Sequence, residues 1–264
     1  MTEKKKLRNF ENIFSELGIK KNDKILINSD IRNLLINFKK KKIRFDPNLI
    51  LDKILKKIGS QGTLLLPTFN WSFCNGVNYD PINSQSSSGS LSRLALKRKK
   101  FQRTLNPIYS FAVTGKDKNK IYRIKHQNCF DMISPFGYMI KNKAKNLFIG
   151  IDYKEAFTFV HVAEQKVGVS YRYLKEFKGK IVDAKKKKNK IKCTMYVRNL
   201  NFNGVTAISK KLDNILKKKK YIKRTKFNGV NFSIIDIAKT YGVIEKDLLR
   251  GGKLVYPKKI QKYV

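Results

Sequence analysis

The chain has little cysteine and less histidine. Its three cysteines, Cys74, Cys129 and Cys193, are widely spaced and form no C-x-x-C pair, so we expect free thiols in a reducing compartment. The two histidines, His126 and His161, stand 35 positions apart without an acidic cluster. A metal site needs three or four ligands at suitable spacing, so we predict that no metal is bound.

Long hydrophobic runs are absent as well. Stretches such as 64–66 have the length of core strands and not of a membrane span, so we expect no transmembrane segment. The N-terminus is basic, but no apolar region of the kind found in signal peptides follows it. Together with the sparse cysteines, these absences predict a cytoplasmic protein.

Acidic residues are also scarce. The sequence has 59 Lys and Arg against 19 Asp and Glu, which gives a net charge of +40. Such a chain attracts polyanions, and nucleic acid is one candidate. However, lysine runs at 39–42, 185–188 and 217–220 fall at expected element ends, and no nucleic-acid-binding module is recognisable. We therefore attribute the high positive charge to a lysine-rich composition along the whole chain, and not to a nucleic-acid-binding site. A basic surface would also suit a phosphate-bearing ligand.

Hydrophobic residues make up 41% of the chain, enough for a folded core. Helical spacing at 8–19 and 47–58 alternates with apolar strands at 24–28 and 63–69. This order predicts an α/β fold, a three-layer α/β/α arrangement with a largely parallel central sheet. Further elements are expected as helices at 89–98 and 134–141 and strands at 107–115 and 146–151.

After about residue 170 the pattern changes to a β-rich and helical C-terminal section. We expect strands within 177–206, separated by a lysine-rich turn, then helices at 206–220 and 233–249 and a last strand at 251–256. We assign 1–264 to a single domain, with a core of about 1–176 and a substrate-facing section of about 177–264.

The clearest chemical signal is His161 followed by Glu164. On a helix these positions share a face, so the carboxylate could accept the Nδ1 proton and leave Nε2 free as a base. The same spacing is also typical of a buried structural pair. The sequence contains neither a G-x-S-x-G nucleophile turn nor a G-x-x-x-x-G-K-[ST] phosphate loop.

Five stretches in order resemble the aminoglycoside 3-N-acetyltransferase family, acyltransferases distinct from the GNAT type. They are "ILINSDI" (25–31), "GTLLLPTFNW" (62–71), "RTLNPIYSFAVTGK" (103–116), "SPFGYMI" (134–140) and "LFIGIDYKEAFTFVHVAEQ" (147–165). The resemblance implies direct acetyl transfer from acetyl-CoA to an amine on a sugar. It assigns His161 as general base and Glu164 as its orienting partner, and it implies that Thr158 caps their helix.

The resemblance also implies where coenzyme A binds: the residues are Ser29, Thr68, Phe69, Arg103, Thr104 and Ser110. It places Asn70 beside the acceptor. The chain departs from the family at Asn28 and Asn106, where a histidine is usual. Asparagine forms hydrogen bonds but relays no proton, so we expect structural roles there. His126 is expected to be solvent-exposed.

The antibiotic acceptors of the family are polycations, which a chain at +40 would repel within the Debye length of about 8 Å. Residues 169–179 resemble relatives connected with surface-polysaccharide biosynthesis. We therefore favour a nucleotide-linked amino sugar over an aminoglycoside, with Tyr171, Arg172 and Lys175 as its contacts. The alternative is a non-enzymatic polyanion-binding or nucleic-acid-binding protein on a degenerate acyltransferase scaffold. A homo-oligomer is compatible with either.

Overall fold

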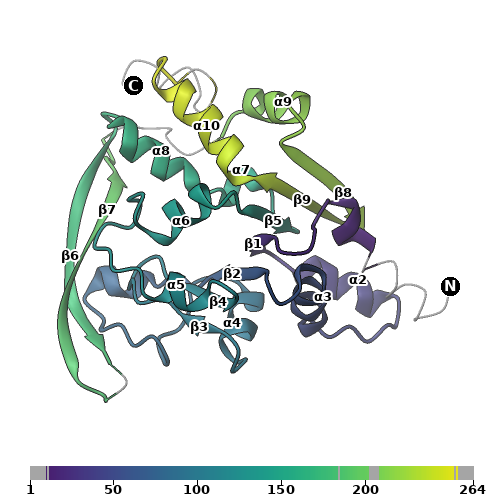
Figure 1. The fold of residues 1–264 in the computed structure, drawn as a ribbon, viewed down its shortest axis with the longest axis horizontal. Coiled ribbons are helices and arrows are strands. Elements are labelled where there is room, and N and C mark those ends of the chain that lie inside the picture. The colour runs from purple at the N-terminus through teal and green to yellow at the C-terminus, as the bar shows by residue number, and fades with distance from the viewer. Residues whose placement is uncertain (1–9, 11, 184, 202–207, 253, 255–264) are drawn as a thin grey trace.

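A seven-stranded sheet forms the centre of the computed structural model, which describes residues 10, 12–183, 185–201, 208–252 and 254 (Figure 1). Its strands lie side by side in the order β3 (Gln102–Arg103), β4 (Phe111–Gly115), β2 (Thr63–Pro67), β1 (Lys24–Ser29), β5 (Lys145–Ile149), β9 (Val230–Asp236) and β8 (Ile222–Phe227).

The central strands are buried on both faces. In β1, Ile25 and Ile27 join one hydrophobic cluster and Leu26 joins the other, because successive side chains point to opposite faces. One face packs against α2 (Arg32–Lys40), α3 (Asn48–Ile58) and α4 (Ser90–Leu96). The opposite face packs against α6 (Pro135–Lys141), α8 (Phe159–Val167), α9 (Lys210–Lys218) and α10 (Ile237–Leu248). The predicted three-layer α/β fold is confirmed.

The prediction of a largely parallel sheet holds only at the centre. Strand β1 pairs in parallel with β2 and β5, whereas the other four strand pairings are antiparallel. The sequence interpretation missed β8 and β9, which a tight turn at Asn228-Gly229 joins. Both turn residues have positive φ, 47° and 80°, as a two-residue hairpin turn requires. The helix predicted from 233 begins at Ile237 instead, where Asp236 accepts the N–H of Lys239.

Other local predictions can be compared directly. Residues 8, 9 and 11 of the predicted helix at 8–19 lie outside the described residues, and its described part ends at Gly18, whose φ is +77°. Ser134 caps α6 by accepting the N–H of Gly137. Thr158 precedes α8, but its side chain accepts no capping hydrogen bond, so that prediction is wrong. The strand predicted at 251–256 falls largely outside the described residues.

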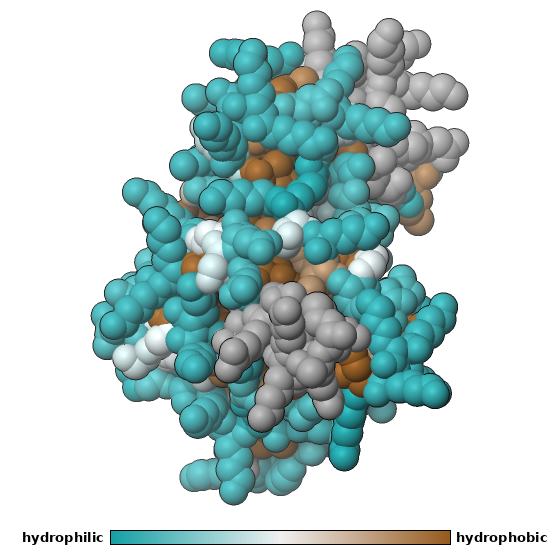
Figure 2. Space-filling view, turned by 90° about the vertical axis from the view of Figure 1, so that its right-hand side faces the viewer, coloured by the Kyte–Doolittle hydropathy of each residue, from teal (hydrophilic) through white to brown (hydrophobic). Residues whose placement is uncertain are grey.

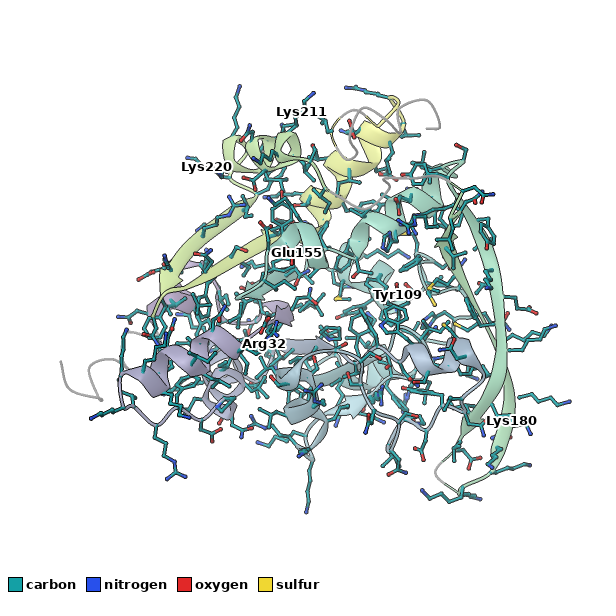
Figure 3. The ribbon with its side chains drawn as sticks, turned by 180° about the vertical axis from the view of Figure 1, so that it is seen from behind. Arg32, Tyr109, Glu155, Lys180, Lys211 and Lys220 are labelled. Atoms are coloured by element: carbon teal, nitrogen blue, oxygen red, sulfur yellow. The ribbon has the colours of Figure 1, made fainter. Side chains whose placement is uncertain are left out.

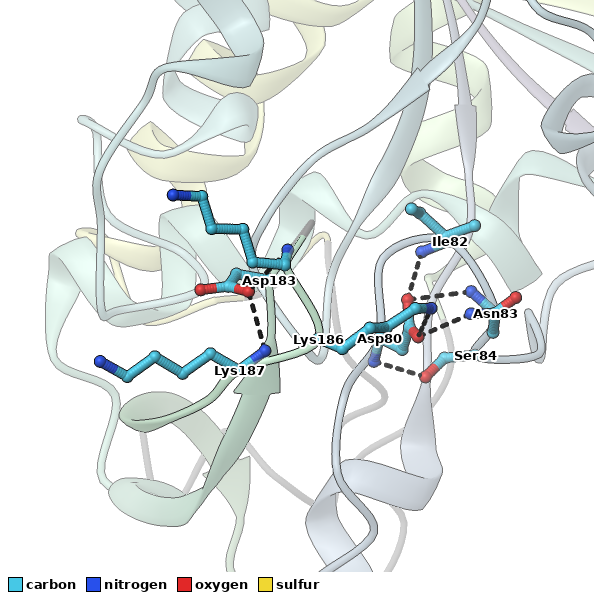
Figure 4. Close-up of polar contacts among 8 residues, drawn as sticks. Asp80, Ile82, Asn83, Ser84, Asp183, Lys186 and Lys187 are labelled. Atoms are coloured by element: carbon cyan, nitrogen blue, oxygen red, sulfur yellow. Dashed lines mark hydrogen bonds and ion pairs between the residues drawn. The ribbon is translucent and has the colours of Figure 1, made fainter.

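A long hairpin, β6 (Arg172–Val182) and β7 (Lys188–Arg198), forms a second sheet along one side of the molecule (Figure 1). Tyr79 anchors it through backbone hydrogen bonds of 2.9 Å to Lys180 and 2.8 Å from Val182. At its tip, Asp183 accepts two backbone N–H groups, next to a loop that Asp80 organises (Figure 4). The hairpin confirms the predicted β-rich segment and its lysine-rich turn.

The remaining elements are short: 3-10 helix η1 (Trp71–Asn75), α5 (Lys118–Tyr122) and α7 (Tyr153–Ala156). Within the described residues, no helix combines the length and apolarity needed to cross a membrane. The face in Figure 2 is mainly hydrophilic, with hydrophobic side chains in small patches.

Candidate active site

His161 and Glu164 form a close pair on α8. The distance between His161 Nδ1 and Glu164 Oε2 is 2.6 Å. The Glu164 side chain is completely buried, whereas the His161 side chain is 29% exposed. The predicted geometry is therefore present: an imidazole reaches solvent on one side and contacts a buried carboxylate through Nδ1.

Two further side chains hold Glu164 from the start of β6. Arg172 Nε lies 2.7 Å from Oε2, and the Tyr171 hydroxyl donates to Oε1 at 3.1 Å. Burial and the neighbouring carboxylate raise the pKa of Tyr171, which therefore remains a donor. Burying a carboxylate is costly unless partners compensate, and these contacts offset that cost. Gly168, with φ +75°, ends α8 and allows the chain to turn back toward Glu164.

These contacts give two of the predicted substrate residues a structural partner. Tyr171 is completely buried and the Arg172 side chain is only 10% exposed, and both are committed to Glu164. Both side chains position the carboxylate, and Arg172 also lines the cavity beside His161. The third predicted residue, Lys175, is exposed farther along β6, with its ammonium 5.3 Å from the Phe177 ring centroid.

A cavity of about 250 Å³ opens beside His161. Its lining consists of one carboxylate, several cations and apolar groups: Lys154, Glu155, Ala156, Phe157, Thr158, Val160, His161, Arg172, Arg198 and Ile208. Arg172 is paired with Glu164, and Lys154 forms an ion pair with Asp152 at 3.2 Å. Within the described part of the chain, Arg198 makes no side-chain hydrogen bond or ion pair. The cavity therefore contains one uncommitted cation.

Four predicted coenzyme A residues, Thr68, Arg103, Thr104 and Ser110, are buried next to β2 and β4. The Arg103 guanidinium donates to Ser110 Oγ at 3.1 Å, to the Thr68 carbonyl at 2.5 Å and to the Ser84 carbonyl. Burial lowers its pKa. At 4% exposure Arg103 has no surface to offer a phosphate, which contradicts the predicted direct contact. Its observed role is to fasten the loop at Ser84 to Thr68, which directly follows β2.

The other predicted binding residues differ in accessibility. Ser29, at the carboxyl end of β1, and Phe69, just beyond β2, are partly exposed. The carboxyl ends of parallel strands are where α/β sheets commonly bind ligands. Asn70 is buried, and its side-chain oxygen accepts the N–H of Ser72 at the start of η1.

Aromatic rings connect the two groups of predicted residues. Phe69 lies 4.6 Å from Tyr109, Tyr109 lies 4.8 Å from Phe130, and Phe130 lies 5.3 Å from the imidazole of His161, measured between ring centroids. Figure 3 shows Tyr109 in the interior of the molecule. The sequence interpretation missed Tyr109 and Phe130, because isolated aromatic residues are indistinguishable from core residues without the fold.

Two asparagines occupy positions where the family usually has histidine, and both have structural contacts. Asn28 Nδ2 donates to Asn146 Oδ1 at 3.1 Å. Asn106 Oδ1 accepts the N–H groups of Ile108 and Tyr109 at 3.0 and 2.8 Å. Asn106 therefore fixes the turn that carries Tyr109.

The prediction that His126 is exposed is wrong. The residue is half-buried, its Nε2 atom is inaccessible and without a partner, and burial lowers its pKa. Among the residues that the structure describes, no three His, Cys, Asp or Glu side chains gather as a metal site.

Solved structures with the same fold cover nearly the whole chain. Sisomicin-bound AAC-VIa aligns with a TM-score of 0.75 and 14% identity, over 95% of this chain and 98% of that one. AAC-IIIb with CoASH gives a TM-score of 0.75 and 12% identity, over 95% and 98%. YokD from Bacillus subtilis aligns with a TM-score of 0.70 and 17% identity, over 92% of this chain and 98% of that one. A comparison with curated protein sequences finds no match.

The family is settled by sequence. The model of the aminoglycoside 3-N-acetyltransferase family matches residues 38–248, which include His161, Glu164 and the predicted coenzyme A segments except Ser29. The chain therefore belongs to the aminoglycoside 3-N-acetyltransferase family, N-acetyltransferases that use acetyl-CoA as acyl donor.

Proposed function

We propose that the protein transfers the acetyl group of acetyl-CoA directly to an amine of a nucleotide-linked amino sugar, with His161 as general base. The observation that carries the proposal is the 2.6 Å contact between His161 Nδ1 and the buried Glu164 carboxylate, beside a cavity. This contact fixes the proton on Nδ1 and leaves Nε2 to take a proton from the acceptor.

In the proposed reaction, the free amine attacks the thioester carbonyl, forming a C–N bond while the C–S bond breaks. His161 takes the proton that the amine loses and can return it to the departing thiolate of coenzyme A. Glu164 stabilises the imidazolium formed in between, and Arg172 and Tyr171 hold Glu164 in place. Holding donor and acceptor together supplies much of the remaining acceleration.

Acetyl-CoA supplies the thioester and binds, in this proposal, along the surface that includes Ser29 and Phe69. Both residues are partly exposed, and Phe69 begins the series of rings that ends at His161. The backbone loop next to Phe69 is held by Ser88 Oγ, which accepts the Phe69 N–H at 3.2 Å, and by Arg103 at Ser84. Arg103, Thr68, Thr104 and Ser110 thus support this surface from below.

The cavity lining favours an acceptor that carries an anion. Arg198 is its uncommitted cation, and Glu155 is the one carboxylate among its lining residues in the described chain. A phosphate would satisfy the Arg198 guanidinium through charge-assisted hydrogen bonds. The second candidate acceptor is an aminoglycoside, which the family name and the sisomicin bound to AAC-VIa support.

A thiol-release assay with acetyl-CoA and a panel of amino sugars tests the base. His161→Gln should lower kcat by about 10² to 10⁴, the usual contribution of a general base. His126→Gln removes the other histidine and should leave kcat within about twofold. Turnover that survives His161→Gln would refute the proposed base.

Comparison of three acceptors tests the substrate class. Arg198→Gln should raise KM about tenfold or more for a nucleotide-linked amino sugar, equivalent to the loss of about 1.4 kcal/mol. It should leave KM for the free amino sugar unchanged. If an aminoglycoside is the better substrate and Arg198→Gln improves its KM, the nucleotide-linked acceptor is wrong.

A further inference from the structure

The three cysteines of the chain come from distant segments but belong to one hydrophobic cluster under the β6–β7 hairpin. Cys129 precedes α6, Cys193 is in β7, and half-buried Cys74 packs against the same cluster from η1. Cys129 and Cys193 are buried, and their Sγ atoms are 3.5 Å apart. Both are reduced in this structure.

The backbone already holds these two thiols face to face. Cys129 N donates to the Thr194 carbonyl and Thr194 N donates to the Gln127 carbonyl, both at 2.9 Å. This bridge ties β7 to the segment before α6. A disulfide needs about 2.05 Å between the sulfurs, so closure requires a contraction of about 1.5 Å between side chains that are in contact.

A cavity lies next to the pair. Asn106 Nδ2 donates to Cys193 Sγ at 3.3 Å, and Asn106 also lines a cavity of about 550 Å³. That cavity lies between the hairpin and the segment around His126, and its walls are largely apolar. Cys193 does not line the cavity and is only 1% exposed, so a peroxide that enters the cavity reaches the sulfur by displacing Asn106.

We propose that Cys129 and Cys193 form a reversible disulfide, a redox modification site that fastens the hairpin to the segment carrying Phe130. The Cys193 thiolate attacks a peroxide O–O bond, giving a sulfenic acid and water (an alcohol from an organic peroxide). The Cys129 thiol then displaces the hydroxyl as water and closes the S–S bond. Two thiols are oxidised for each peroxide reduced.

The electrostatics of the pair support this order of events. The hydrogen bond from Cys129 lowers the pKa of Cys193, whereas burial raises the pKa of Cys129. Asn106 gives the same order, since its Nδ2 donates to Cys193 Sγ at 3.3 Å whereas its Oδ1 accepts from Cys129 Sγ at 3.8 Å, so Cys193 is the attacking thiolate and Cys129 the resolving thiol. The pKa of Cys74 is raised, mainly by burial and to a lesser extent by the nearby Cys193, and this disfavours Cys74 as the nucleophile.

Formation of the disulfide would affect the active site through the ring of Phe130. Phe130 follows Cys129 directly and packs 5.3 Å from the His161 imidazole. Movement of Cys129 toward β7 therefore displaces Phe130 relative to His161. The proposal itself is independent of the acceptor and of the role assigned to His161.

The experiment treats the purified full chain with peroxide at a small molar excess and then with dithiothreitol. We expect the loss of two hydrogen masses, a non-reduced peptide map linking Cys129 to Cys193, and full reversal on reduction. The crosslink should raise Tm by roughly 5 °C or more, since it closes a loop of more than 60 residues. Imidazole NMR signals come from only two histidines, and that of His161 should shift on oxidation.

Variants separate the specific pair from general oxidation. Cys74→Ser should leave the linked peptide and the Tm rise intact, whereas Cys193→Ala should abolish both. If Cys193→Ala does not fold, the wild-type map still decides. A disulfide that includes Cys74, or overoxidation of a folded protein without a Cys129–Cys193 link, would overturn the proposal. A link that leaves the His161 signal unmoved would overturn its connection to the active site.

Discussion

The His161–Glu164 pair lies on one helix, α8, but the position of Glu164 depends on residues at the start of strand β6. The His161–Glu164 spacing could be predicted from the sequence, because i and i+3 positions share a helix face wherever the helix lies. Arg172 and Tyr171 were predicted as ligand contacts, since the sequence cannot reveal that the start of β6 returns to α8. Their commitment to Glu164 became evident only from the fold.

Replacement of Arg172 should therefore affect stability as well as activity. Arg172→Gln leaves the buried Glu164 carboxylate without its ion-pair partner, which should cost about 3 kcal/mol. Urea unfolding measures this loss, and Lys175→Gln on the exposed part of the same strand should change stability by less than about 0.5 kcal/mol. Equal midpoints for the two variants would show that Glu164 does not need Arg172.

His126 should make folding stability depend on pH. Burial lowers its pKa below the unfolded value of about 6.5, whereas Asp131 opposes this shift. Below pH 6.5 the unfolded chain gains a proton that the folded chain resists, so stability falls until the pH reaches the lower folded pKa. The neighbouring cavity also contains Lys125 and Lys192, which disfavour the imidazolium.

Urea midpoints for His126→Gln at pH 7.5 and pH 5.0 check this prediction. The variant should lose less stability between the two values than the wild type does. An unchanged difference between the pH values would mean that His126 is as solvated in the folded chain as in the unfolded one.

At the scale of elements, most buried strands and amphipathic helices could be predicted, because their periodicity arises from burial. Strands β8 and β9 were missed, although Asn228-Gly229 is a typical hairpin turn. The helix-like run after 233 concealed β9, since short apolar stretches do not distinguish strand from helix. Arg103 shows a similar limit: its motif was recognisable, but its burial depends on the loop at Ser84.

The end of β5 should tolerate no side chain at Gly150. Its φ is +68°, and an added Cβ would lie 2.1 Å from the Asp30 carbonyl oxygen, next to Ser29. Gly168 has a similar φ of +75° but open space around it. Gly150→Ala should therefore destabilise the protein by at least about 2 kcal/mol more than Gly168→Ala.

Thermal unfolding of the two glycine variants isolates the close contact from the backbone conformation. Gly150→Ala should also weaken acetyl-CoA binding if the turn at Ser29 contributes to that surface. Similar Tm values for the two variants would indicate that the backbone at Asp30 moves to accommodate the added Cβ without loss of stability.

At the scale of the whole molecule, strand order was beyond the sequence. Alternating helices and strands predicted parallel pairing, which β2, β1 and β5 adopt. Strands β4 and β9 pair antiparallel with the outer strands of this centre, β2 and β5. The residues of β4 and β9 do not by themselves specify which strand each pairs with. The single sheet continues across the predicted boundary near 177, because β8 and β9 complete it.

The net charge of +40 is also a property of the whole molecule. Figure 3 shows Lys180 on the hairpin far from Lys211 and Lys220, which both lie at α9 on another part of the periphery. A dedicated nucleic-acid interface would concentrate cations on one face, with each phosphate contact contributing about 0.9 to the salt slope on duplex DNA. A dispersed charge instead predicts weak polyanion binding that no single lysine cluster controls.

Two triple variants test this dispersion, each replacing three exposed lysines by glutamine. One set lies on the hairpin and the other on and after α9: Lys178, Lys180 and Lys190, against Lys211, Lys218 and Lys220. Binding to a random duplex, measured against salt concentration, should weaken similarly in both, with salt slopes that differ by less than about 1. If the hairpin set alone abolishes binding, the charge does not act in a dispersed way and the hairpin is a polyanion interface.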